Sequence, residues 1–207
     1  MYRNIFWDLG GTMVDTYPQL DTMLAGVVKK SGYNVLDLNV AQLTRVSTKH
    51  AINVLSERFG IPEEEFRTAE RALKHCWETN PPWPMPGITD ILDRVKSVGG
   101  LNLVVTNRDR KSAEALLRGL GLDVDDIVCP EDGFPRKPDS AMHLYFLDKY
   151  GLELSECLAV GDRSIDINVA HAVGMDVALL ETPGVRMDAP DADIHIQALA
   201  QLLRLIG

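Results

Sequence analysis

The segment NIFWDLGGT, at residues 4–12, decides the fold of this chain more than any other stretch. Its first four residues, Asn4 to Trp7, are mostly apolar and aromatic, which is typical of a short buried strand. The strand ends at Asp8, and the residues Gly10-Gly11-Thr12 form a glycine-rich turn after it. We therefore predict that Asp8 lies directly beyond the carboxyl end of a buried strand.

The second half of the chain alternates between short apolar segments and amphipathic helices. The predicted strands cover residues 103–105, 127–129, 158–160 and 177–180, and the predicted helices cover residues 88–98, 112–120, 140–150, 165–173 and 196–206. Short apolar strands separated by helices are typical of a parallel sheet covered on both faces. The predicted fold class is therefore α/β, with a Rossmann-like parallel sheet and helices on both of its faces.

Residues 18–75 have a different pattern, because their apolar residues recur at helical spacing throughout. The proline-rich segment NPPWPMPG, at residues 80–87, follows this region and marks the return to the sheet. We predict an inserted all-helical cap at residues 17–83 and a core domain made of residues 1–16 and 84–207.

Composition limits the classes of function. The chain has 207 residues with 21 Lys and Arg against 30 Asp and Glu, so its formal net charge is −9, and this excess of acid argues against binding of nucleic acid. Its longest apolar runs fall well short of the roughly 18 residues that a membrane span needs. Three widely spaced cysteines fit free thiols in a reducing compartment. We expect a cytoplasmic protein, either a monomer or a homodimer, that does not bind membranes.

Polar residues follow four of the predicted strands, and in a parallel sheet these positions meet at one edge, where ligands bind. Besides Asp8, they are Thr106-Asn107-Arg108, Lys137 and the pair Asp162 and Asp166. Carboxylates at such an edge suit Mg²⁺, which takes one or two of them together with water and phosphate. Lys137 and Thr106 can bind phosphoryl oxygens, and the Asp8 carboxylate can attack phosphorus.

The order and spacing of these four motifs resemble the haloacid dehalogenase superfamily, in particular its phosphoglycolate-phosphatase-like branch with an inserted helical cap. The resemblance covers essentially the whole chain. It implies that Asp8 is the catalytic nucleophile and that Lys137 holds the charges of the nucleophile and the phosphate together. It further implies that Thr106 and Asn107 bind the phosphoryl group.

The same resemblance implies a magnesium site. Its ligands are Asp8, Asp162 and the backbone carbonyl of residue 10, with Asp166 binding directly or through water. We add Gly11 of the glycine-rich turn and Arg108 as phosphate-binding candidates. For Arg108 a surface salt-bridge cluster with Asp109 and Arg110 is the alternative. The implied substrate is a small phosphorylated metabolite.

One position departs from the pattern of the family. Phosphatases of this kind carry a second aspartate two residues after the nucleophile as general acid and base, and here Gly10 stands in its place. General acid–base catalysis is worth about 10²–10⁴-fold in rate, or roughly 3–5 kcal/mol of activation free energy. Three alternatives remain: a phosphohydrolase of restricted activity, a catalytically weak phosphate-binding or regulatory protein, and a phosphonatase- or dehalogenase-type hydrolase.

A replacement acid would have to come from the cap or from the substrate. His50 lies in a predicted cap helix with Arg45 and Lys49, and histidine is a residue type suited to this role near neutral pH. The alternative for His50 is simple packing of its helix. Tyr17 follows the predicted hinge and either meets the substrate or belongs to the start of the next helix.

Overall fold

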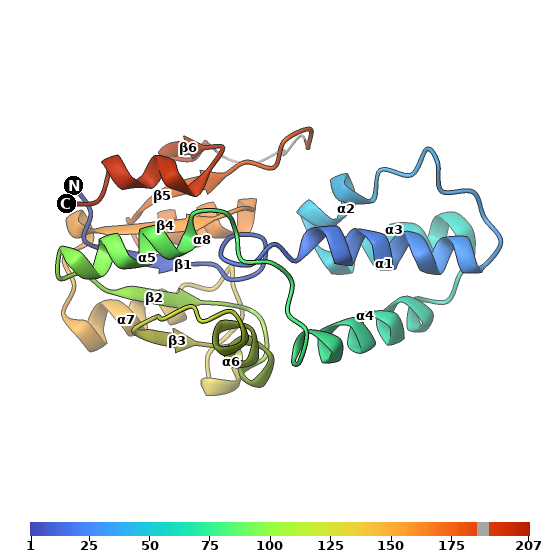
Figure 1. Cartoon of the computed structure of the whole chain (residues 1–207), viewed down its shortest axis with the longest axis horizontal. Helices are drawn as coiled ribbons and strands as arrows, with labels where there is room; N and C mark the ends of the chain where they lie inside the picture. Colours follow the sequence, from blue (N-terminus) through green and yellow to red (C-terminus); the bar gives the residue numbers. More distant parts are fainter. Residues whose placement is uncertain (186–190) are drawn as a thin grey trace.

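The computed structural model describes residues 1–185 and 191–207, which form two lobes side by side (Figure 1). One lobe holds a sheet whose described strands run in the order β3-β2-β1-β4-β5-β6, and every neighbouring pair is parallel. The strands are β1 (Asn4–Trp7), β2 (Asn102–Val105), β3 (Asp126–Val128), β4 (Cys157–Gly161), β5 (Asp176–Leu180) and β6 (Ile194–Ile196). The predicted α/β class is confirmed.

The side chains of β1 alternate between the two faces of the sheet, as a strand requires. Ile5 and Trp7 pack against α5, α6 and the closing 3₁₀ helix η3, whereas Phe6 packs against α7 and α8 on the opposite face. Both faces are therefore buried, which explains why the strand sequence is continuously apolar. The covering helices are α5 (Ile88–Ser97), α6 (Arg110–Gly119), α7 (Ala141–Tyr150), α8 (Ser164–Ala172) and η3 (Leu199–Arg204), and two short 3₁₀ turns occur at Pro130–Asp132 and Leu154–Glu156.

The second lobe contains helices and no strand. They are α1 (Tyr17–Lys30), α2 (Val40–Val46), α3 (Thr48–Phe59) and α4 (Glu63–Trp77), and they surround a separate apolar core. Helix α3 begins where the Ser47 hydroxyl accepts a hydrogen bond from the His50 amide, and it ends at Gly60, whose φ of 64° suits a glycine. No helix among the described residues has the length and apolar character needed to cross a membrane.

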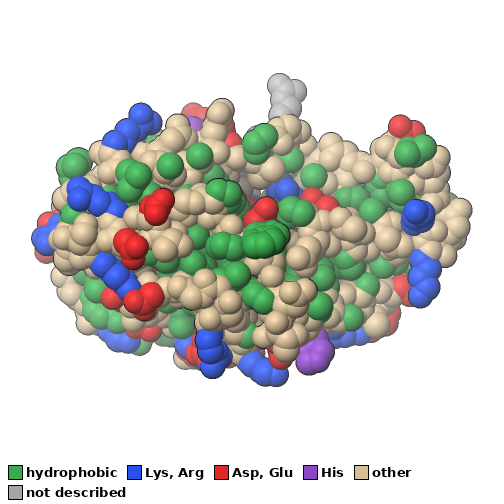
Figure 2. Space-filling model, in the orientation of Figure 1, with side chains coloured by type: hydrophobic (Ala, Val, Ile, Leu, Met, Phe, Trp, Pro, Cys, Tyr) green, Lys and Arg blue, Asp and Glu red, His purple; other side chains and the backbone are tan. Residues whose placement is uncertain are grey.

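Two chain segments connect the lobes and lie against each other. The Asp15 amide donates to the Trp83 carbonyl at 2.9 Å, and the Met85 amide donates to the Met13 carbonyl at 2.8 Å. On the face seen in Figure 2, hydrophobic side chains gather over the middle of the molecule, where these connections lie. The backbone bonds fix where the helical lobe starts and where the chain returns to the sheet.

The end of the chain differs from the prediction. A helix was expected over residues 196–206, but residues 194–196 form the edge strand β6 and the following helix is the short 3₁₀ helix η3. The isoleucines of Ile194–Ile196 alternate around His195, which is a strand pattern, and only two residues separate this strand from η3.

Candidate active site

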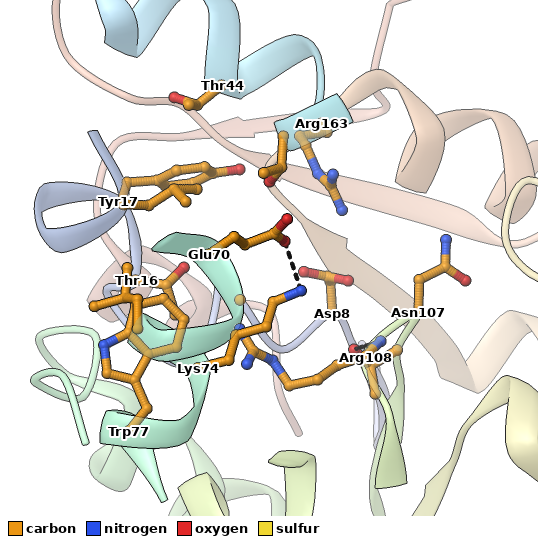
Figure 3. Close-up of a pocket in the computed structure, with 15 residues that line it drawn as sticks. Asp8, Thr16, Tyr17, Thr44, Glu70, Lys74, Trp77, Asn107, Arg108 and Arg163 are labelled. Atoms are coloured by element: carbon orange, nitrogen blue, oxygen red, sulfur yellow. Dashed lines mark hydrogen bonds and ion pairs between the residues drawn. The ribbon is translucent and has the colours of Figure 1, made fainter. Parts of the chain in front are cut away.

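Asp8, Thr106 and Asp162 follow the adjacent strands β1, β2 and β4, so the topology brings them to one edge of the sheet. Asp8 and Thr106 line a pocket of about 160 Å³ that opens between the two lobes (Figure 3). The sheet lobe also contributes Asn107 and Arg108 to the lining, and the helical lobe contributes Glu70 and Lys74. Asp8 thus lies at the base of a pocket whose opposite side belongs to the helices.

Lys137 joins two buried carboxylates beneath this pocket. Its ammonium donates to Asp8 Oδ1 at 2.5 Å and to Asp166 Oδ1 at 2.7 Å, and the side chains of all three are at most 5% exposed. One oxygen of Asp8 is therefore held, whereas Asp8 Oδ2 is buried with no hydrogen-bond partner among the described residues. That oxygen is the one available to bind a cation or to attack a substrate.

The same three groups shift one another's pKa values. Burial raises the pKa of Asp8 against the opposing effect of Lys137. Burial alone would lower the pKa of Lys137, but Asp166 and Asp8 outweigh it and hold the pKa above its usual value. Burial alone would raise the pKa of Asp166, but the positive charges of Lys137 and Arg163 outweigh burial and lower this pKa below its usual value.

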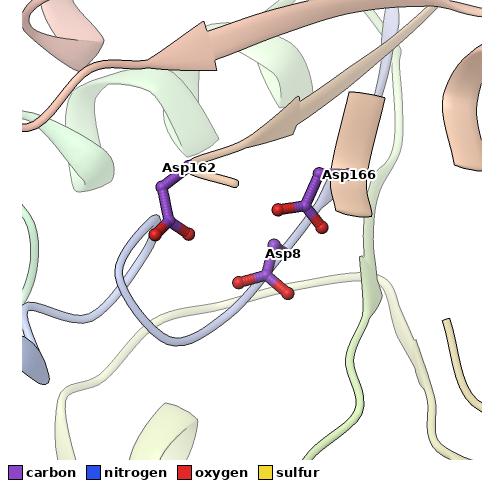
Figure 4. A group of neighbouring side chains, drawn as sticks. All are labelled: Asp8, Asp162 and Asp166. Atoms are coloured by element: carbon purple, nitrogen blue, oxygen red, sulfur yellow. The ribbon is translucent and has the colours of Figure 1, made fainter. Parts of the chain in front are cut away.

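Asp8, Asp162 and Asp166 form a compact carboxylate cluster (Figure 4). One oxygen from each lies within 4.8 Å of the others. The unpartnered Asp8 Oδ2 and the all-oxygen donor set fit a hard divalent cation such as Mg²⁺. Asp166 is engaged at both oxygens, because its second oxygen accepts a bond from the Arg163 amide at 3.2 Å.

Asp162 is oriented by two hydroxyl groups. Thr12 donates to its Oδ1 at 3.0 Å, and Tyr17 donates to its Oδ2 at 2.6 Å. Burial raises the pKa of Asp162 to about 7. Tyr17, which the sequence placed at the hinge, lines the pocket and touches the carboxylate cluster directly.

Gly11 takes part in the site differently from what we expected. It was predicted to bind phosphate, but its amide donates to the Val14 carbonyl at 2.8 Å. A Cβ at Gly11 would lie 2.3 Å from the Tyr17 ring and 2.7 Å from Asp162 Oδ2, and its φ is 97°. The glycine is needed for a tight turn that lets Tyr17 and Asp162 approach each other.

Asn107 also has a positioning contact that sequence reasoning missed. Its side-chain oxygen accepts from the Lys137 amide at 2.8 Å, and its side-chain nitrogen donates to the Lys137 carbonyl at 3.0 Å. Asn107 therefore clamps the backbone of Lys137 while lining the pocket. The hydroxyl of buried Thr106 accepts from the Arg108 amide at 3.1 Å.

Arg108 lies beside the position of the missing acid. A Cβ at Gly10 would be 3.7 Å from Arg108 Nη2 and 3.4 Å from the Thr16 hydroxyl oxygen. The guanidinium donates to the Ser112 hydroxyl at 3.0 Å and packs over the Trp77 ring, 5.1 Å from its centroid. Arg108 thus faces the pocket instead of joining a surface cluster, and burial lowers its pKa.

The cap side of the pocket also differs from expectation. His50 is exposed and lies outside the pocket lining. The charged cap residues of the lining are Glu70 and Lys74 of α4, whose side chains form an ion pair of 2.6 Å (Figure 3). Their spacing of four residues predicts a shared helix face, but it does not indicate that this face turns towards Asp8.

Comparison with known proteins agrees with this fold. The sequence profile of the haloacid dehalogenase-like hydrolases matches residues 5–180, and the chain belongs to this family. A phosphoglycolate phosphatase of Agrobacterium fabrum is 30% identical over 203 residues, covering 91% of this chain and 86% of that protein. An N-acetylmuramic acid 6-phosphate phosphatase of Pseudomonas aeruginosa is 26% identical, covering 85% and 80%.

Solved structures share the arrangement of both lobes. A hydrolase from Streptococcus pneumoniae superposes with a TM-score of 0.70 at 25% identity, covering 99% of this chain and 97% of that one. A predicted phosphoglycolate phosphatase from Haemophilus somnus superposes with a TM-score of 0.77 at 24% identity, with the same coverage. Within the family, the chain is a phosphohydrolase of the phosphoglycolate-phosphatase-like branch.

Proposed function

We propose that this chain hydrolyses the phosphate ester of a small metabolite through an aspartyl phosphate on Asp8. The single observation that supports it most is the asymmetry of Asp8. Lys137 holds one oxygen at 2.5 Å, and the other oxygen is buried without a partner among the described residues, at the base of the pocket. The pocket volume of about 160 Å³ suits a small substrate.

In the proposed reaction, Asp8 Oδ2 attacks phosphorus and the bond to the leaving oxygen breaks. Lys137 offsets the negative charge that gathers around Asp8 and the phosphoryl group, with Asn107 holding Lys137 in place. Thr106 and Arg108 are proposed to bind the phosphoryl oxygens. Water then attacks the phosphorus of the aspartyl phosphate, which regenerates the Asp8 carboxylate and releases inorganic phosphate.

We further propose that Asp8, Asp162 and the carbonyl of Gly10 hold Mg²⁺, with Asp166 acting directly or through water. The compact carboxylate cluster supports this proposal. When bound, Mg²⁺ supplies positive charge that offsets the charge of the phosphoryl oxygens. Residues 17–83 are proposed as the cap and residues 1–16 and 84–207 as the core. The free cysteines support the proposal of a cytoplasmic location.

Gly10 and Arg108 favour a second candidate function, binding of phosphate with little or no turnover. A guanidinium beside Gly10 attracts an anion and supplies no proton to a leaving group. A third candidate, phosphonate hydrolysis, requires a neutral cap lysine that can form a Schiff base. Lys74 is the cap lysine in the pocket, but it forms an ion pair with Glu70 that a Schiff base would break.

The decisive experiment measures phosphate release from acetyl phosphate, p-nitrophenyl phosphate and phosphoglycolate with Mg²⁺. We expect release that stops with EDTA and with Asp8→Asn. Asp90→Asn is the matched control, because Asp90 is an exposed carboxylate in α5 outside the site. Full activity in a folded Asp8→Asn variant would remove Asp8 as the nucleophile. Bound phosphate without release from any substrate would establish the second candidate.

A further inference from the structure

The position of the leaving group follows from Asp8 and the pocket. Phosphoryl transfer places the attacking and leaving oxygens roughly in line on opposite sides of phosphorus. Asp8 lies at the base of the pocket, on the sheet lobe, so the leaving oxygen of a bound ester faces the helical lobe. A proton donor for that oxygen must therefore be sought among the residues that line the opposite side.

Most titratable groups in the lining are unsuited to this task. Tyr17 already donates its hydroxyl proton to Asp162 at 2.6 Å. Arg108 and Arg163 are guanidinium groups, which do not release protons in proteins. The remaining titratable groups across from Asp8 in the described pocket are Glu70 and Lys74.

Of these two residues, Glu70 can orient its neighbour and Lys74 can donate a proton. Glu70 Oε1 and Lys74 Nζ are 2.6 Å apart, so the carboxylate accepts from the ammonium. The Glu70 side chain is 17% exposed, whereas that of Lys74 is 42% exposed and faces the open pocket. An ammonium has three N–H donors, and this ion pair occupies one of them. Two donors are left for a substrate oxygen.

We propose that Lys74 replaces the missing acid at Gly10, with Glu70 as the residue that positions it. As the bond from phosphorus to the leaving oxygen breaks, a Lys74 N–H proton moves to that oxygen, which departs as a neutral alcohol and leaves a neutral amine. The amine then takes a proton from the water that attacks the aspartyl phosphate, which restores the ammonium. This inference rests on the proposed function and specifies its acid–base catalyst.

The test compares kcat/KM for 2,4-dinitrophenyl, 4-nitrophenyl and phenyl phosphate, which differ in leaving-group acidity and not in charge. This parameter reports the steps up to phosphoryl transfer to Asp8. In Lys74→Met we expect the ratio of the dinitrophenyl to the phenyl substrate to rise about 100-fold, because only the poor leaving group needs the proton. Lys74→Arg keeps the charge and is expected to show the same rise. Glu70→Gln should show a smaller rise in the same direction.

Arg67→Met is the matched control, since Arg67 forms an ion pair with Glu63 on the same helix, outside the pocket. An unchanged ratio in Lys74→Met would overturn the proposal. An unchanged ratio combined with a loss confined to phosphoglycolate would make Lys74 a binding group for the substrate carboxylate. A wild-type chain that hydrolyses none of these esters would refute the proposed function itself, and the acid role with it.

Discussion

Replacing Gly10 by aspartate tests whether the missing acid limits turnover. Gly10 lies outside the left-handed region of φ, so a side chain adds no backbone strain. The new Cβ would lie 3.4 Å from the Thr16 hydroxyl oxygen and 3.7 Å from Arg108 Nη2. These are ordinary van der Waals contacts, so the side chain has room. Because the substitution also restricts the unfolded chain, we expect the free energy of unfolding to change by less than about 1 kcal/mol.

The expected gain in rate follows from the neighbouring Arg108. A general acid is worth about 10²–10⁴-fold. A guanidinium close to a carboxyl group lowers its pKa by about 1–3 units, and each unit reduces the protonated fraction tenfold. The gain in kcat/KM for phenyl phosphate in Gly10→Asp is therefore on the order of tenfold. In a Lys74→Met background it should be larger, because the second acid no longer competes.

Steady-state kinetics on phenyl and 2,4-dinitrophenyl phosphate measure this gain, and urea unfolding checks the fold. Gly10→Asn is the matched control, since it has the same shape and no acidic proton. A folded Gly10→Asp variant with no gain over Gly10→Asn in either background would show that protonation of the leaving group does not limit the rate. The reasoning on Gly10 and on Lys74 would then both fail.

Three further outcomes follow from the buried groups. At His143 the unfolded state binds one more proton than the folded state below pH 6.5, because burial lowers the pKa of His143 to about 3. The contribution of His143 to stability should thus fall by about 2–3 kcal/mol between pH 6.5 and pH 4.5, whereas that of Asp162, whose pKa burial raises to about 7, rises over the same range. Urea titrations of His143→Leu should lack the part of the acid dependence that comes from His143. Mg²⁺ must displace the proton that Asp162 holds below its pKa of about 7. Calorimetry should therefore show that the affinity for Mg²⁺ falls as the pH drops, by up to about tenfold per pH unit. An affinity for Mg²⁺ that does not depend on pH would contradict the proposed metal site. Lys137→Met leaves Asp8 and Asp166 buried without their common cation. Chemical unfolding at neutral pH should show a free energy of unfolding lower by about 3–5 kcal/mol. A decrease below about 1 kcal/mol would mean that Lys137 does not hold the two carboxylates as described.

The sequence was sufficient to place strands β1 to β5 and the residues that follow them, but not the edge strand β6. Strands β1, β2 and β4 begin and end within a residue or so of their predicted bounds, because each is a short apolar run ended by a polar or glycine residue. Parallel topology then places Asp8 and Asp162 together, since it fixes which ends of the strands meet. The bounds of a strand depend on the residues of that segment itself, and such local features can be predicted from the sequence.

Orientation between elements could not be predicted in this way. The side-chain amide of Asn107 binds the backbone of Lys137, thirty residues away, and no local pattern indicates that contact. Which side of α4 faces Asp8 depends on how the whole helical lobe sits over the sheet. That packing places Glu70 and Lys74 in the pocket and leaves His50 at the surface. A histidine has a suitable ordinary pKa, but position decides whether it can act.

The charge of the pocket determines which measurement separates the enzyme from a phosphate-binding protein. Its described lining contains two carboxylates, Asp8 and Glu70, against three cations, Lys74, Arg108 and Arg163. An aspartate in place of Gly10 would add a third carboxylate beside Arg108. The absence of an aspartate at position 10 therefore strengthens the attraction of the pocket for a phosphate dianion. The same absence removes a proton donor. Tight phosphate binding is expected from either function, because Gly10 favours binding in both. Release of phosphate from an ester is what distinguishes them, since a phosphate-binding protein without turnover releases none. The dependence of that release on leaving-group acidity then reports the proton donor.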